Sequence, residues 1–116
     1  LLAEYAGAAN RPAITWPDGT EIWYQHGNRH RDGGPAVTHR DGGEIWYQNG
    51  HRHRLDGPAF TAAGGTEEWW VGGNRHRTDG PAVIHSDGRL EWWENDERKE
   101  PEEEIKLSAA WNARTP

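Results

Sequence analysis

The 116-residue chain contains no cysteine and no methionine, only two lysines and two serines, and no long apolar run. Without cysteine, neither a disulfide nor a thiolate nucleophile is available. No apolar stretch approaches the roughly 20 residues that a membrane span needs, and no stretch has the pattern of a secretory signal peptide. The chain does not begin with methionine, so an upstream segment stays open. These absences exclude several classes of protein and leave a single small domain.

The charge is unevenly distributed, although the net value is −6. Residues 11–90 hold 9 arginines against 10 acidic residues, whereas residues 91–116 hold 8 acidic residues against 4 basic ones. The near-neutral body argues against a general polyanion binder, and therefore against nucleic acid as the partner. Arginine outnumbers lysine by 11 to 2, which predicts ordered arginines that pair and stack rather than solvated surface charges.

What the chain does contain is a repeat with a period of 23 residues. Four residue types recur in one register, which chance does not produce. Prolines, glycines, tryptophans and arginines keep the spacing at Pro12, Pro35, Pro58 and Pro81, at Gly19, Gly42, Gly65 and Gly88, at Trp23, Trp46, Trp69 and Trp92, and at Arg29, Arg52, Arg75 and Arg98. A period of this length is typical of proteins built from stacked structural units.

Each copy is predicted to form three short antiparallel strands. In the first copy we expect strands over residues 13–16, 21–25 and 28–31, separated by turns at residues 17–20 and 26–27. The dipeptides Asp-Gly and Asn-Gly at these turns favour two-residue hairpins of type I′. The fold class is therefore all-β: an elongated antiparallel β-meander or solenoid sheet of about four 23-residue repeats, with short helical caps at the N- and C-termini.

The two turns also predict a register. A two-residue Asp-Gly turn would pair an apolar residue with each tryptophan: Ile14 with Trp23, Val37 with Trp46, Phe60 with Trp69, and Val83 with Trp92. A two-residue second turn pairs tryptophan with histidine, as in Trp23 with His30, Trp46 with His53, and Trp69 with His76. We therefore expect the apolar, tryptophan and histidine columns to share one face, which would be the core.

The opposite face is predicted to carry the candidate binding residues. The second turn pairs an aromatic residue with an arginine in every copy: Tyr24 with Arg29, Tyr47 with Arg52, Trp70 with Arg75, and Trp93 with Arg98. Aromatic residues and arginine are enriched at protein-binding hot spots. The alternative is local: each arginine stacks on its own aromatic neighbour and shields it from water. The same face could also stack nucleic-acid bases or hold an anionic carbohydrate or lipid headgroup.

Three segments are expected. Residues 1–10 would form an N-terminal cap, residues 11–100 the repeat domain, and residues 101–116 an acidic C-terminal cap or tail. The C-terminal segment begins with Pro101 and three glutamates, which favours a helix start. Four residues of that helix could supply a buried side: Ile105, Leu107, Ala109 and Trp111.

Metal binding and catalysis are both poorly supported. Three strands per repeat would hold equivalent histidines about 14 Å apart, too far for a shared zinc ion, and His51 and His53 lack an evident third ligand. His39 is expected opposite Glu44 as a cross-strand pair. No Gly-x-Ser-x-Gly elbow and no phosphate-cradling loop occur. We therefore predict no enzyme activity, no cofactor and no metal.

The stretch Tyr47-Gln48-Asn49-Gly50-His51-Arg52-His53 resembles the MORN repeat. That family has an aromatic residue two positions before Asn-Gly, a histidine four positions after that asparagine, and a period of 23. The resemblance covers residues 12–100. The chain departs from the family where Arg31, Arg54 and Arg77 replace the glycine after the histidine, which resembles a divergent subgroup of bacterial and phage proteins.

The resemblance implies an elongated, twisted antiparallel scaffold that contacts other proteins. Lipid binding has been proposed for some members, and a few bacterial relatives are described as antitoxins. We therefore expect a non-catalytic protein-binding scaffold: an adaptor, an inhibitor or antitoxin, or a phage structural component. The rival hypothesis is a module that binds nucleic acid or an anionic carbohydrate or lipid through the aromatic–arginine face. We expect a cytoplasmic or virion-associated location, and self-association through the sheet edges or exposed face stays open.

Overall fold

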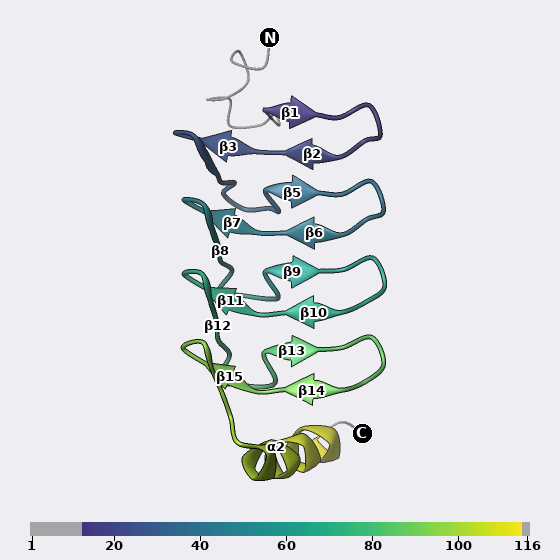
Figure 1. Cartoon of the computed structure of the whole chain (residues 1–116), viewed down its shortest axis with the longest axis vertical. Helices are drawn as coiled ribbons and strands as arrows, with labels where there is room; N and C mark the ends of the chain where they lie inside the picture. The colour runs from purple at the N-terminus through teal and green to yellow at the C-terminus, as the bar shows by residue number, and fades with distance from the viewer. Residues whose placement is uncertain (1–12, 115–116) are drawn as a thin grey trace.

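The computed structural model describes residues 13–114, so the cap expected over residues 1–10 lies outside the described residues. The chain is mostly β and elongated, with principal extents of 53 × 25 × 21 Å, and hairpins follow one another along the long axis (Figure 1). Eight two-residue strands form one antiparallel sheet in the order β1-β2-β5-β6-β9-β10-β13-β14. Their bounds are β1 (Ile14–Thr15), β2 (Glu21–Ile22), β5 (Val37–Thr38), β6 (Glu44–Ile45), β9 (Phe60–Thr61), β10 (Glu67–Glu68), β13 (Val83–Ile84) and β14 (Leu90–Glu91).

Four separate hairpins lie beside this sheet, so the prediction of one continuous meander is wrong. They are β3 (Tyr24–Gln25) with β4 (Asn28–Arg29), β7 (Tyr47–Gln48) with β8 (His51–Arg52), β11 (Trp70–Val71) with β12 (Asn74–Arg75), and β15 (Trp93–Glu94) with β16 (Glu97–Arg98). Successive hairpins are linked by backbone hydrogen bonds, such as Gly50 N to Arg29 O at 2.9 Å. The large sheet holds two strands per 23 residues, so equivalent positions lie about 10 Å apart rather than 14 Å.

A tryptophan lies at each change from the large sheet to a hairpin. The N–H of Trp23 donates to the carbonyl of Ala36 at 2.7 Å, while its own carbonyl accepts from the N–H of His30 at 3.0 Å. The same residue therefore pairs on one side with the chain entering the next large-sheet strand, and on the other with its own hairpin. This confirms the pairing of Trp23 with His30, and Trp46 and Trp69 pair with His53 and His76 in the same way.

The first turn is one residue longer than predicted. Trp16 N donates to Thr20 O at 2.8 Å, which leaves a three-residue loop, and Gly19 has φ of +96°. Type I′ needs a positive φ at both central residues, and Asp18 does not have one. Its carboxylate instead accepts the N–H of Thr20 at 2.9 Å, a hydrogen bond typical of aspartate in turns.

The extra residue shifts the register by one and overturns the predicted faces. Each expected apolar–tryptophan pair is wrong: Ile14 lies opposite Ile22, Val37 opposite Ile45, Phe60 opposite Glu68, and Val83 opposite Glu91. A one-residue slip moves a side chain to the other face of a sheet. The cluster of Ile22, Val37 and Ile45 consequently packs against Tyr24 and Tyr47, not against the tryptophan column. For the same reason Glu44 lies opposite Thr38 rather than His39.

The chain ends in a helix, α2 (Pro101–Ala113), as its proline and acidic first turn predicted. Leu107 and Trp111 are half-buried, whereas Ile105 is 71% exposed and Ala109 is also exposed. The predicted set alternates every two residues, but a helix repeats every 3.6, so only positions four apart share a face. The helix contacts β14, the last strand of the large sheet (Figure 1). Among residues 13–114, no helix is long and apolar enough to cross a membrane.

Candidate functional site

The eight candidate binding residues form a continuous row, which we call the ladder. The predicted pairs are confirmed: Tyr24 lies opposite Arg29, Tyr47 opposite Arg52, Trp70 opposite Arg75, and Trp93 opposite Arg98. The two-residue second turns that set these pairs have positive φ at both central residues, such as 50° at Asn49 and 84° at Gly50. This is the type I′ geometry that Asn-Gly favours.

The arginines of the ladder bridge neighbouring hairpins rather than only stacking within their own. The Cζ atom of Arg29 lies 5.6 Å from the ring centre of Tyr47, and that of Arg52 lies 5.2 Å from the ring of Trp70. Arg75 lies between two rings, 5.1 Å from Trp70 and 5.0 Å from Trp93. These distances lie within the range of cation–π attraction. The aromatic side chains are half-buried, while Arg29 and Arg98 are exposed.

Tyr47 is the most highly connected residue of the ladder. Arg29 Nη1 donates to its hydroxyl at 3.4 Å, and its ring packs on the apolar cluster of the large sheet. Burial acts to raise the pKa of Tyr47, but hydrogen bonds and charges from Arg52 and Arg29 outweigh it and hold the pKa below its ordinary value. The expectation that Tyr47 is a free recognition residue without structural contacts is therefore wrong.

Two glutamates supply acceptors to the ladder where tryptophan replaces tyrosine. Trp70 Nε1 donates to Glu68 at 2.8 Å, and Trp93 Nε1 donates to Glu91 at 2.9 Å. In the first two copies the position of the glutamate holds isoleucine, and the aromatic residue is tyrosine. A half-buried indole N–H needs an acceptor, so the two substitutions fit one another. The sequence analysis missed this pairing, although both changes occur together, two positions apart.

A second arrangement, the Trp–Arg clasp, was also missed. A guanidinium lies 3.9 Å from the ring centre of the tryptophan in three copies: Arg31 over Trp23, Arg54 over Trp46, and Arg77 over Trp69. These are the arginines that follow the histidines. The signal was available, because they share the 23-residue spacing and precede a Pro-Ala dipeptide in each copy.

The clasp at Arg54 shows why its loop has this sequence. Arg54 Nε donates to Asp56 at 3.0 Å, and its Nη1 donates to the carbonyl of Pro58 at 3.2 Å. A Cβ atom at Gly57 would lie 2.8 Å from the Cζ of Arg54, so only glycine leaves room for the guanidinium. Arg77 repeats the arrangement, and its hydrogen bond to Asp79, followed by its charge, lowers the pKa of that carboxyl.

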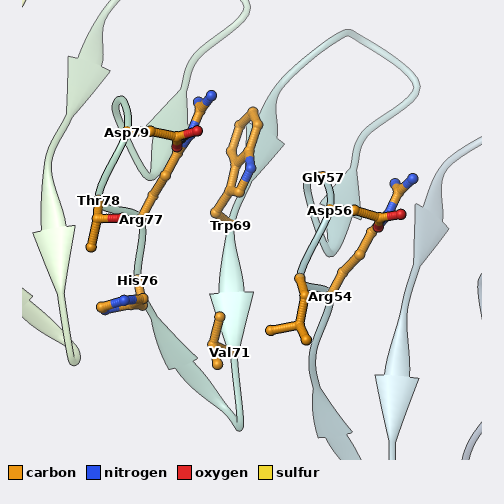
Figure 2. Close-up of a pocket in the computed structure, with 10 residues that line it drawn as sticks. Arg54, Asp56, Gly57, Trp69, Val71, His76, Arg77, Thr78 and Asp79 are labelled. Atoms are coloured by element: carbon orange, nitrogen blue, oxygen red, sulfur yellow. Dashed lines mark hydrogen bonds and ion pairs between the residues drawn. The ribbon is translucent and has the colours of Figure 1, made fainter.

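A cavity of about 430 Å³ opens between two clasps. Figure 2 shows Trp69 between Arg77 with Asp79 on one side and Arg54 with Asp56 on the other. One face of the indole carries the guanidinium of Arg77, and the indole also lines the cavity. A further hollow of about 270 Å³ lies along the ladder, between Tyr47 and Trp70.

The histidine column connects neighbouring copies. The N–H groups of Asn49, Gly72 and Asn95 donate to Nδ1 of His30, His53 and His76 at 2.9, 2.9 and 3.0 Å. Each histidine thus accepts a hydrogen bond from the turn of the following hairpin, rather than lying under its own tryptophan. In residues 13–114, no group of three or more histidines and carboxylates could hold a metal ion.

Comparisons of the chain with protein-family models, with curated proteins and with solved structures gave no match.

Proposed function

We propose that the chain is a MORN-like repeat scaffold of four 23-residue units that binds another protein through the ladder. It acts without catalysis, as an adaptor, an inhibitor or antitoxin, or a phage structural component. The observation that carries the proposal is the continuity of the ladder: four aromatic residues and four arginines alternate along neighbouring hairpins, with ring-to-guanidinium distances of 5.0–5.6 Å.

Rigidity and partial exposure support this role. Type I′ turns and hydrogen bonds between hairpins fix the spacing of the side chains, so little conformational entropy is lost when a partner binds. Aromatic residues and arginine supply much of the free energy at protein interfaces. The hollow between Tyr47 and Trp70 offers a place for a side chain of the partner.

The test is affinity capture with wild-type protein and with Arg29→Ala/Arg52→Ala, followed by direct binding of the purified captured protein. The control is Arg89→Ala, because the Arg89 side chain is 71% exposed and pairs only with Asp87 two residues away. We expect a partner that binds wild type and control equally and binds the double variant at least tenfold more weakly. Equal binding to all three proteins would refute a role for the ladder.

The rival proposal, binding of a nucleic acid or an anionic carbohydrate or lipid, uses the same arginines. It predicts retention on heparin and on single-stranded DNA that falls steeply with salt and is lost in the double variant. Two observations weigh against it: residues 11–90 are near neutral, and Glu68 and Glu91 lie along the ladder with side chains only 15% and 17% exposed.

A further inference from the structure

We infer that the 430 Å³ cavity beside Trp69 is an anchor site for an aromatic side chain of a partner protein. This site is separate from the ladder, and its residues come from the clasps and the loops that follow them. The occupant is a segment that presents an aromatic residue followed, three positions later, by a basic residue.

The chain itself shows how such a site is filled. Trp111 of α2 packs beside the last clasp: a Cβ atom at Gly80 would lie 2.7 Å from the Cζ3 atom of Trp111, and the Cζ atom of Arg77 lies 5.1 Å from its ring centre. A smaller hollow of about 220 Å³ remains there, lined by Trp92 and Trp111 among others. An indole thus covers a clasp arginine and its glycine.

The equivalent position 23 residues earlier is open. Gly57, Arg54 and Trp69 correspond to Gly80, Arg77 and Trp92, and all three line the larger cavity. The three atoms nearest to a Cβ at Gly57 all belong to the guanidinium of Arg54, whereas at Gly80 the nearest atom belongs to Trp111. The surface that accepts an indole at the end of the chain is therefore repeated in the middle, without the indole.

The exposed charge at the mouth selects a basic neighbour. The Asp56 and Asp79 side chains are 85% and 83% exposed, whereas those of Arg54 and Arg77 are only 25% and 14% exposed. A partner therefore meets carboxylates at the mouth and guanidinium groups inside. In α2, Arg114 lies 4.2 Å over the Trp111 ring, and its Nη1 donates to the Asp79 carbonyl at 3.4 Å.

An apolar contact is available beside the acidic mouth. Leu55 lines the cavity and is 80% exposed, an unusual exposure for leucine in a chain with so few apolar residues. A partner side chain that enters the cavity would cover it. The corresponding residue beside α2 is Thr78.

The probe is a synthetic peptide of residues 100–114, capped at both ends and labelled, titrated with the full chain and followed by fluorescence anisotropy and calorimetry. We expect saturable binding of one peptide per chain, at least about tenfold weaker when the peptide carries Trp111→Ala. Leu55→Arg in the full chain removes the apolar rim and repels the peptide arginine, so it should also weaken binding about tenfold. Thermal unfolding would check that this exposed substitution leaves the fold intact.

Thr78→Arg is the matched control, because it lies at the equivalent position beside the surface that α2 already covers. Unchanged binding to Thr78→Arg supports the open cavity as the site. The inference is overturned if the peptide does not bind, if the Trp111→Ala peptide binds equally well, or if Thr78→Arg rather than Leu55→Arg weakens binding. In the last case the peptide would be displacing α2 from its own position. None of these outcomes depends on the ladder arginines, so failure here leaves the proposed function standing.

Discussion

Gly57→Ala tests the clasp most directly. The new methyl group would lie 2.8 Å from the Cζ and 3.1 Å from the Nε and Nη1 of Arg54, closer than such atoms approach. The backbone of Gly57 lies outside the left-handed region, so alanine adds no strain of its own there. The expected result is that Arg54 leaves its position over Trp46, together with its bonds to Asp56 and Pro58.

The magnitude follows from the contacts that are lost. The stacked guanidinium contributes about 1 kcal/mol, the hydrogen bond to the carbonyl of Pro58 about 1 kcal/mol, and the pair with the exposed Asp56 about 0.5 kcal/mol. The reduced entropy of the unfolded chain offsets about 0.5 kcal/mol. We therefore expect Gly57→Ala to lower the free energy of unfolding by about 2 kcal/mol, which corresponds to a Tm lower by about 8–16 °C for a chain of this size.

Two further variants make the prediction falsifiable by chemical denaturation. Gly64→Ala is the matched control, because no atom lies within 4 Å of its Cβ position, and it should be neutral or slightly stabilising. In an Arg54→Ala background the methyl group has nothing to displace, so Gly57→Ala should cost less than about 0.5 kcal/mol. Equal stability of Gly57→Ala and Gly64→Ala, or the same loss with and without Arg54, would refute the clasp as the reason for the glycine.

Three other outcomes are expected. Tyr47→Ala should cost about 2 kcal/mol in urea unfolding, because its ring packs on the apolar cluster, while Tyr47→Phe should cost less than about 1 kcal/mol; a neutral Tyr47→Ala would contradict the observed register. His53→Ala removes the acceptor for the Gly72 N–H, so it should cost about 1–2 kcal/mol and speed amide exchange at Gly72. Burial raises the pKa of Glu91, but hydrogen bonds led by that from His85 bring it below its ordinary value; its contribution is therefore present at neutral pH and lost as pH falls through the lowered folded-state pKa. Stability measured from pH 6 to pH 3 should thus fall less steeply in Glu91→Gln than in wild type.

The ladder could be predicted from the sequence, but its surroundings could not. The pairing of Tyr47 with Arg52 depends only on the two-residue Asn49-Gly50 turn, and that turn adopts the type I′ geometry that its residues favour. What lies beneath Tyr47 depends instead on the longer first turn. The dipeptide Asp-Gly is compatible with loops of two or of three residues, and the choice between them decides which face each side chain takes.

The period of 23 residues, the antiparallel strands, the second turn and the C-terminal helix are consequences of local sequence. They depend on residues close together in the chain, where backbone preferences and short-range hydrogen bonds dominate. The change of sheet at Trp23, the clasp of Arg54 over Trp46, and the packing of Trp111 beside Gly80 were decided only by tertiary structure. Each depends on whether a particular side chain fits a space made by another segment, and the sequence does not contain the shape of that space until the chain has folded around it.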